Sequence, residues 1–308
     1  RCEYKDGKWG ELYATEDVNM NIHMASTSLH YGQEVFEGLK AFRGVDGKVR
    51  LFRVEENAKR MINSGEYLKM AVPSVELFTK ACIEAVKLNA DYIPPYGSGA
   101  SLYLRPMLIG VGPQVGVKPS ADYMFAVFVT PVGPYFKDGF NCIKVIVDYD
   151  HDRAAPKGTG HVKVGGNYAA SLDSGEIAHQ KGFASVIFLD PATKQYIDEC
   201  SAANFFGIRD GKYITPDSHS VLPSITNKSL RQIAEDLGLQ VEQRKVNIDE
   251  LPTFSETGCC GTAAVISPIG SVYDPKTDKT VVYGDGKTAG PWSQKLYKTL
   301  QGIQYGEI

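Results

Sequence analysis

Residues 161–168 read HVKVGGNY, which places Lys163 between two valines and shortly before two glycines. The alternation of apolar and polar residues predicts a strand, and the glycine pair would let another group approach the backbone closely. Desolvation lowers the pKa of an amine and makes it a better nucleophile toward an aldehyde. Lys163 is therefore a candidate catalytic residue, whereas the alternative is a solvated lysine on a strand edge.

A phenol and a carboxylate follow this lysine. Tyr168 ends the HVKVGGNY stretch, and Glu199 stands at the end of a predicted strand that reads IDEC at residues 197–200. Pyridoxal phosphate needs a lysine for its aldehyde, a donor for its ring oxygen and a carboxylate that keeps its pyridine nitrogen protonated. The three residues together fit this cofactor, although each one alone could be structural.

Two segments could bind a phosphate. Residues 222–226, LPSIT, lead directly into a predicted helix at 226–237, whose first amides and Thr226 hydroxyl could point at an anion. Residues 258–264 form a predicted turn of small residues with exposed amides, suited to a phosphate or a carboxylate. A plain helix cap and a tight structural turn are the alternatives. Residues 110–113, GVGP, lack the third glycine of a dinucleotide fingerprint, which excludes that site.

A candidate carboxylate clamp lies in residues 101–106, SLYLRP. A strand here places Tyr103 and Arg105 on one face, with Leu102 and Leu104 on the other. An arginine beside a tyrosine can bind a carboxylate, and a surface ion pair is the alternative.

Hydrophobic periodicity predicts a mixed α/β chain. Predicted helices lie at 54–70, 74–91, 168–180, 226–237 and 291–301. Predicted strands lie at 101–109, 122–130, 142–148, 185–190, 195–197, 205–209 and 240–246, with an Asp210-Gly211 turn.

Composition excludes several function classes. The 308 residues carry a net charge of -3, which lacks the basic excess that nucleic-acid binding requires. The apolar runs are shorter than the roughly 20 residues that cross a bilayer. The six cysteines show no metal-binding spacing, and no secretory signal is visible. We therefore expect a cytoplasmic protein with reduced thiols and no metal, membrane or nucleic-acid partner.

Two longer motifs, YGQEVFEGLKAF at 31–42 and KVGGNY at 163–168, resemble the branched-chain amino acid aminotransferases. Segments 102–106, 131–136, 222–226 and 261–263 fit the same family in the same order. The resemblance implies an α/β, two-domain fold type IV pyridoxal-phosphate enzyme of the D-amino acid aminotransferase-like kind. A small N-terminal α/β domain at 1–131 and a larger cofactor-binding domain at 143–308 would be joined by a linker at 132–142.

The resemblance also implies an activity: transamination of Leu, Ile and Val with 2-oxoglutarate, by a homodimer whose pocket takes residues from both chains. Lys163 would form the Schiff base with pyridoxal 5'-phosphate and then move the α-proton, while Tyr168 would hold the ring oxygen and Glu199 the ring nitrogen. The phosphate would be bound by Arg60, Ile225, Thr226 and Thr262. The substrate α-carboxylate would be bound by Thr262, Ala263 and Tyr103, and the side-chain pocket would be shaped by Tyr31, Phe36, Val132 and Arg105.

Some features separate this chain from related families. Ala264 and Ser267 stand where some relatives carry a CxxC pair, so a thiol redox switch is not expected. Cys200 follows Glu199 where many relatives have glycine. A D-amino acid aminotransferase or an aminodeoxychorismate lyase would have the same fold, but the 31–42 motif argues against both. A silent ligand-binding descendant is the third alternative, against which the intact Lys163, Tyr168 and Glu199 argue.

Overall fold

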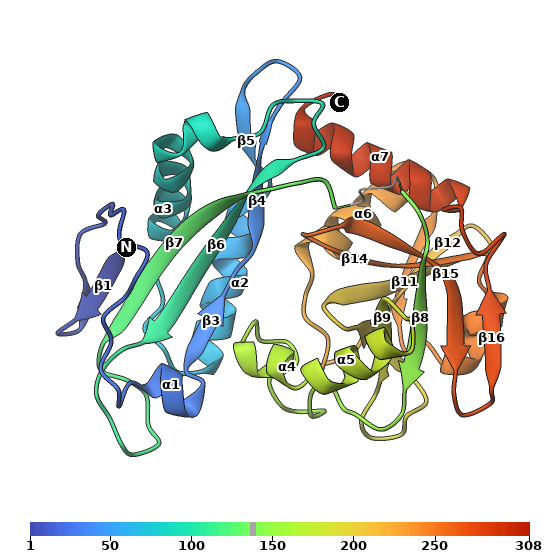
Figure 1. The fold of residues 1–308 in the computed structure, drawn as a ribbon, viewed down its shortest axis with the longest axis horizontal. Helices are drawn as coiled ribbons and strands as arrows, with labels where there is room; N and C mark the ends of the chain where they lie inside the picture. Colours follow the sequence, from blue (N-terminus) through green and yellow to red (C-terminus); the bar gives the residue numbers. More distant parts are fainter. Residues whose placement is uncertain (136–139) are drawn as a thin grey trace. The chain divides into compact units, whose positions relative to one another are not determined.

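The computed structural model describes residues 1–135 and 140–308, which form two compact units (Figure 1). Unit 1 comprises residues 1–134, 162–166 and 304–306, and unit 2 comprises residues 135–161, 167–303 and 307–308. The units differ from the expected division at 131 and 143 because Lys163 and its neighbours belong to unit 1. Residues 136–139 of the predicted linker, including Phe136 of the 131–136 motif, lie outside the described residues.

Unit 1 contains a seven-stranded sheet within the described part of the chain, with the order β2-β1-β7-β6-β4-β5 and β3 beside β6. The long strands β6 and β7, which the sequence predicts at 101–109 and 122–130, pair antiparallel. The strands are β1 (Cys2–Lys5), β2 (Lys8–Trp9), β3 (Glu34–Phe36), β4 (Leu39–Arg43), β5 (Val49–Leu51), β6 (Ser101–Gly110) and β7 (Tyr123–Val132).

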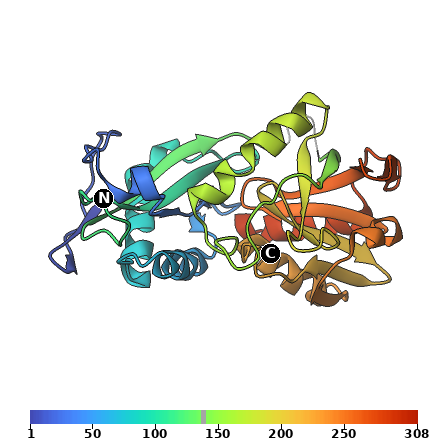
Figure 2. The same cartoon turned by 90° about the horizontal axis from the view of Figure 1, so that it is seen from below.

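Two helices, α2 (Val54–Tyr67) and α3 (Val75–Leu88), pack together on one face of this sheet (Figure 2). The hydroxyl of Ser74 caps α3 by accepting a hydrogen bond from the Leu77 amide at 3.1 Å. The helical spacing of Phe78 and Cys82 buries both side chains completely in the core that includes Leu104 of the sheet. The short helices α1 (Thr27–Tyr31) and η1 (Ala90–Tyr92) lie in the connections.

Unit 2 is built on a sheet that closes on itself. Its order is β10-β9-β8-β15-β14-β11-β12-β13, with β16 beside β15, and β10 also pairs with β11. The closure buries the apolar core between the strands. The strands are β8 (Ile143–Asp148), β9 (Ser185–Leu189), β10 (Ile197–Cys200), β11 (Ala203–Arg209), β12 (Lys212–Pro216), β13 (Gln240–Arg244), β14 (Glu256–Gly261), β15 (Val265–Asp274) and β16 (Lys279–Val282).

The helices of unit 2 cover the outside of this sheet. Helix α5 contacts β8 and β9, and α6 contacts β13 and β14. The buried carboxylate of Glu256, at the start of β14, accepts hydrogen bonds from the amides of Trp292 and Ser293 in the first turn of α7. The helices are α4 (Gly165–Ala169), α5 (Leu172–Gln180), α6 (Ile225–Asp236), η2 (Ile248–Thr253) and α7 (Pro291–Tyr305). The first two residues of α4 and the last two of α7 belong to unit 1.

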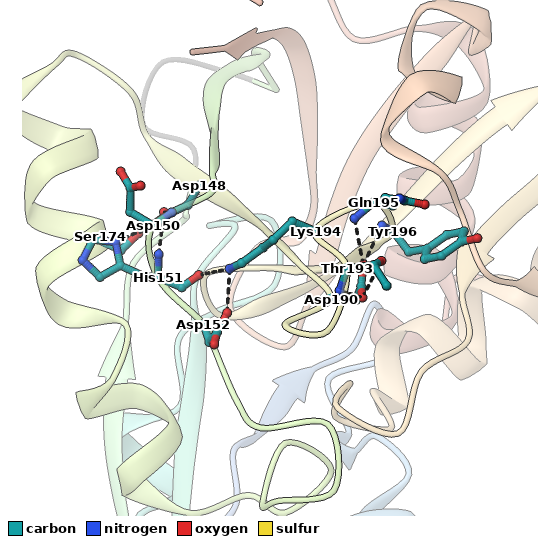
Figure 3. A network of polar contacts seen from close by, with 10 residues as sticks. All are labelled: Asp148, Asp150, His151, Asp152, Ser174, Asp190, Thr193, Lys194, Gln195 and Tyr196. Atoms are coloured by element: carbon teal, nitrogen blue, oxygen red, sulfur yellow. Dashed lines mark hydrogen bonds and ion pairs between the residues drawn. The ribbon is translucent and has the colours of Figure 1, made fainter. Parts of the chain in front are cut away.

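The predicted Asp210-Gly211 turn is confirmed. It joins β11 to β12, and both residues have the positive φ that a two-residue hairpin of this type requires, 50° and 70°. The predicted strand at 195–197 is confirmed in part: Tyr196 forms a bridge with Asn247 and Ile197 begins β10, while Oδ1 of Asp190 accepts hydrogen bonds from the amides of Gln195 and Tyr196 across the preceding turn (Figure 3). The strand β10 begins after this turn and continues through Glu199.

Three further predictions are corrected by the structure. Residues 161–164 form no strand, because the segment exchanges too few backbone hydrogen bonds with a neighbour, although Val162 and Val164 are buried in alternation as predicted. The helix predicted at 168–180 is broken because the Ser171 amide and hydroxyl both donate to Tyr168 O. The turn predicted at 258–264 is reduced to 262–264, since residues up to Gly261 belong to the buried strand β14.

We expect Glu256→Ala to lower the free energy of unfolding of unit 2 by about 3 kcal/mol, because several hydrogen bonds to a buried charged acceptor are lost at once. Urea unfolding followed by the fluorescence of Trp292 measures the change. Lys298→Ala, at an exposed position of the same helix, is the control and should change the stability by less than about 0.5 kcal/mol. Equal effects of the two substitutions would show that Glu256 does not support α7.

Candidate functional site

Lys163 lies in unit 1 on an extended segment that crosses the end of β3. Its amide donates to the Ser64 hydroxyl at 3.1 Å, and its carbonyl accepts from the Phe36 amide at 3.1 Å. The ammonium nitrogen stands 4.7 Å from the centre of the Phe36 ring. The backbone of Lys163 is thus anchored on both sides, and its half-buried amine lies over an aromatic face.

The segment after Lys163 is held by Glu34. The Gly165 amide donates to Oε1 of Glu34, and a side chain at Gly165 would overlap that carboxylate. Burial raises the pKa of Glu34, while this hydrogen bond acts in the opposite direction. The close approach predicted for the glycine pair is therefore present at Gly165, and Glu34 is a supporting residue that the sequence analysis missed.

The predicted face of β6 is confirmed, because Leu102 and Leu104 are fully buried while Tyr103 and Arg105 are partly accessible. Nη2 of Arg105 donates to the Tyr103 hydroxyl at 3.0 Å, and its guanidinium carbon lies 4.7 Å from the Phe36 ring centre. Gly38 has no side chain here because a Cβ would overlap the Tyr103 hydroxyl. Lys163, Phe36, Tyr103 and Arg105 therefore form one group within unit 1.

Arg60 is held by a buried carboxylate. Its Nε and Nη2 donate to the two oxygens of Glu37 at 2.7 and 2.8 Å, and Asn57 donates to the same carboxylate at 2.7 Å. Glu37 is fully buried, so this planar, charge-assisted pair fixes the direction of the guanidinium. Glu37 belongs to the 31–42 motif, but its role as the partner of Arg60 is visible only in the structure.

Tyr31 and Val132 lie outside this group. Tyr31 ends α1, is 40% exposed, and donates its hydroxyl to Val115 O. Val132 is the last residue of β7 and pairs with Ser101. The structure thus places both residues in unit 1 without joining them to Phe36 and Arg105.

Glu199 lies on β10, on the face of the unit 2 sheet that it shares with Asn204 and Cys260, and is 2% exposed. Its Oε2 accepts a hydrogen bond from Asn204 at 2.8 Å, and its Oε1 forms an ion pair with Nη2 of Arg153 at 2.5 Å. The ion pair lacks the alignment of a hydrogen bond, so among the described residues Oε1 accepts none. Burial raises the pKa of Glu199, and the charge of Arg153 lowers it.

Asn204 brings three segments together. It pairs with Glu199 on β10 and with Cys260 on β14, and its side chain donates to Leu222 O at 3.1 Å. The start of α6 and the end of β14 therefore converge near Glu199. Asn204 was missed, although a polar residue directly before the apolar run at 205–208 was a signal that could have identified it.

The two predicted anion sites lie at these segment ends. Ser224 caps α6 by accepting from the Asn227 amide at 3.1 Å, so Ile225 and Thr226 are the first helical residues. The cap is thus Ser224, and the amides of Ile225 and Thr226 suit an anion. Thr262 follows β14 directly, with Ala263 exposed beside it, and the turn ends at Val265 with a φ of 65°. A β-branched residue rarely adopts this conformation, which marks a constrained turn.

Tyr168 lies half-buried on α4 in unit 2, next to the buried Asn167. Asn167 accepts from the Thr159 hydroxyl at 2.8 Å and donates to Thr159 O at 2.7 Å, which ties α4 to the loop before it. This tie fixes the backbone that carries Tyr168.

The three thiols nearest Glu199 are buried. A hydrogen bond with Cys259 and burial raise the pKa of Cys200, and burial raises the pKa of Cys260. All six cysteines are free in the described structure. Because the thiolate is the reactive form, these buried thiols are chemically protected.

The class IV aminotransferase family matches residues 34–272, and the chain belongs to this family. The branched-chain-amino-acid aminotransferase of Haemophilus influenzae is 51% identical over all of this chain and 91% of its own length. The enzyme of the same name from Helicobacter pylori is 50% identical over 99% of this chain and 89% of its own length. The fold type predicted from the sequence is therefore confirmed.

Solved structures agree with this membership. The Escherichia coli branched-chain amino acid aminotransferase matches with a TM-score of 0.76 and 28% identity, over 99% of this chain and 95% of its own. A T.th. branched-chain amino acid aminotransferase with pyridoxamine 5'-phosphate matches with a TM-score of 0.81 and 27% identity, over 100% of this chain and 95% of its own.

In the described part of the chain, no helix has the length and hydropathy of a membrane span.

We expect mild peroxide followed by reductant to produce no reversible cycle of activity, because the thiols of Cys200 and Cys260 stay protonated. Peptide mass spectrometry should find the half-buried Cys142 oxidised before Cys200, Cys259 or Cys260. A reversible cycle that disappears in Cys259→Ala/Cys260→Ala would contradict this prediction.

Proposed function

We propose that this chain is a pyridoxal-phosphate-dependent branched-chain-amino-acid transaminase. It moves the α-amino group of Leu, Ile or Val to 2-oxoglutarate and yields the branched-chain 2-oxo acid and glutamate. The observation that carries the proposal is about half identity, along the whole chain, to two bacterial enzymes of that name. A D-amino acid aminotransferase or aminodeoxychorismate lyase activity has no comparable support.

The residues of unit 2 fit the cofactor. The buried Oε1 of Glu199 lacks a hydrogen-bond donor, as expected of an acceptor that awaits a pyridinium N–H. The amides of Ile225 and Thr226 at the start of α6, with Thr262 after β14, suit a phosphate. When bound, the cofactor supplies an electron sink for the carbanion that forms at the substrate α-carbon.

Three further residues are proposed to bind the cofactor, and one of them also carries a proton. Lys163 supplies the amine for the cofactor aldehyde and, once released, carries the α-proton as a general base. The Tyr168 hydroxyl donates to the ring oxygen. The Arg60 guanidinium, oriented by Glu37, would offset the negative charge of the phosphate.

The substrate has two ends to be recognised. The amides of Thr262 and Ala263, with the Tyr103 hydroxyl, bind the α-carboxylate common to all substrates. Phe36 and Arg105 offer an apolar ring beside a cation, so one pocket can accept an aliphatic side chain or the distal carboxylate of glutamate. Tyr31 and Val132 complete the pocket in a homodimer that takes residues from both chains.

A direct test of the chemistry uses Lys163→Ala. The parent protein should show a visible absorption band with pyridoxal phosphate, borohydride should attach the cofactor covalently, and a coupled assay should detect transfer from L-Leu to 2-oxoglutarate. The variant should lose both trapping and turnover. Retention of a tenth of the parent rate would remove Lys163 from this role, and transfer from D-amino acids only would favour the rival activity.

Arg105→Met tests how the pocket accepts glutamate. We expect kcat/KM for 2-oxoglutarate to fall about tenfold to a hundredfold, because a charge-assisted hydrogen bond is lost, while the half-reaction with Leu changes far less. Stopped-flow measurement of each half-reaction separates the two. Equal losses with both substrates would assign Arg105 to the α-carboxylate or to the fold.

A further inference from the structure

Two side chains that the proposed function does not use contact the two oxygens of the Glu199 carboxylate. Arg153 contacts Oε1 and Asn204 contacts Oε2. Both side chains are themselves at least nine-tenths buried, at 7% and 5% exposure. A buried carboxylate held on both oxygens has a fixed direction, and a paired cation favours its ionised form.

Arg153 is fixed independently of Glu199. Its Nη1 donates to Ser220 O at 2.8 Å and to Gly160 O at 3.3 Å. The two carbonyls converge because Gly160 has no side chain, since a Cβ there would overlap Ser220 O. The guanidinium is therefore aimed at Glu199 by backbone atoms of two loops.

The chain that leads into Arg153 is anchored by a polar network (Figure 3). Asp148 accepts from the Asp150 and His151 amides at 2.8 and 3.0 Å, and from the His151 ring at 2.9 Å. Lys194 donates to His151 O at 2.9 Å and to the Asp152 carboxylate at 2.6 Å. These contacts hold the loop immediately before Arg153 against the turn that precedes β10, the strand of Glu199.

On the other side, Asn204 is tied to the first turn of α6. Nδ2 of Asn227 donates to Oδ1 of Asn204 at 3.2 Å and to the Thr215 hydroxyl at 2.9 Å. Oδ1 of Asn227 accepts from the Tyr213 hydroxyl at 2.8 Å. A buried network in which every member is paired is rigid, so Glu199 and the start of α6 are held at one separation.

We propose that Arg153, Asn204 and Asn227 are positioning residues: Arg153 keeps Glu199 ionised and directed at the ring nitrogen, and the Asn204–Asn227 bridge keeps that carboxylate in register with the phosphate-binding start of α6. The proposal rests on the proposed function. Without the cation next to Glu199, the proton shared with the ring nitrogen moves to the carboxylate, because a buried charge that has lost its partner is neutralised. The ring then loses its strength as an electron acceptor.

The test uses the holoenzyme, loaded with pyridoxal phosphate labelled with ¹⁵N in the ring. In the parent, the ¹⁵N chemical shift should report a protonated ring nitrogen around neutral pH. In Arg153→Gln, which removes the charge but keeps a donor for the two carbonyls, the shift should move toward that of the unprotonated ring. The first half-reaction with L-Leu should slow on the order of tenfold to a hundredfold, the usual size of losing a supporting contact. Glu199→Gln gives the limiting values of both measurements.

Two other variants extend the comparison. Arg153→Lys restores the charge and should restore the protonated ring nitrogen, which a purely structural role for Arg153 would not require. Asn227→Ala leaves both charges in place, so the ring nitrogen should stay protonated while the dissociation constant of pyridoxal phosphate rises by about tenfold. Arg244→Met is the matched control, since Arg244 forms an ion pair with Glu250 at 2.7 Å on β13 of the same unit.

The outcomes separate the inference from the proposed function. If the parent forms no visible band and does not convert L-Leu, the proposed function fails. Suppose instead that the parent is active. If Arg153→Gln then keeps a protonated ring nitrogen and reacts with L-Leu as fast as the control Arg244→Met, the positioning role is overturned. If Arg153→Gln does not fold, the other two variants decide. The role is overturned if the ring nitrogen is unprotonated in Arg153→Lys, or if Asn227→Ala binds pyridoxal phosphate as tightly as the parent.

Discussion

The pairing of β10 with β11 is the constraint on which unit 2 depends. Glu199 pairs with Asn204 at this seam, and Asn204 pairs in turn with Cys260. The closure pairs the outer edge of β10 with β11, and the Glu199 carboxylate is buried at this seam. A carboxylate in such a place requires partners, and Arg153 and Asn204 provide them. The same closure brings the start of α6 and the end of β14 to one place.

Unit 1 holds two cations in fixed directions. Arg60 is directed by the buried Glu37, and Arg105 by the Tyr103 hydroxyl and the Phe36 ring. Planar guanidinium groups suit both arrangements, because carboxylates and aromatic faces contact them in defined geometry. Glycine at 38 then lets Tyr103 approach the neighbouring backbone. The motif at 31–42 thus contains residues that position other side chains as well as residues that are proposed to bind the substrate.

Much of the fold could be predicted from local patterns. The helical spacing around Phe78, the alternation along β6 and the Asp210-Gly211 turn all follow from rules that act within a few residues, and all were confirmed. The strand IDEC at 197–200 was confirmed as β10, but its predicted start at 195 was too early, because the Asp190 side chain captures amides five and six residues ahead, which periodicity does not register. The segment of Lys163 alternates like a strand because both valines enter the core, although no sheet pairs with it.

The sequence by itself determined the identities of the chemical groups: an amine, a phenol and a carboxylate in order, with a helix start and a small-residue turn suited to anions. Their types follow from the residues, and the ordered motifs indicate the family. Only the tertiary structure decided which residues support them. Glu37, Arg153 and Asn227 carry no local signature of their roles, since each acts on a residue more than twenty positions away. Burial and the pairing it requires arise only when distant strands and loops meet.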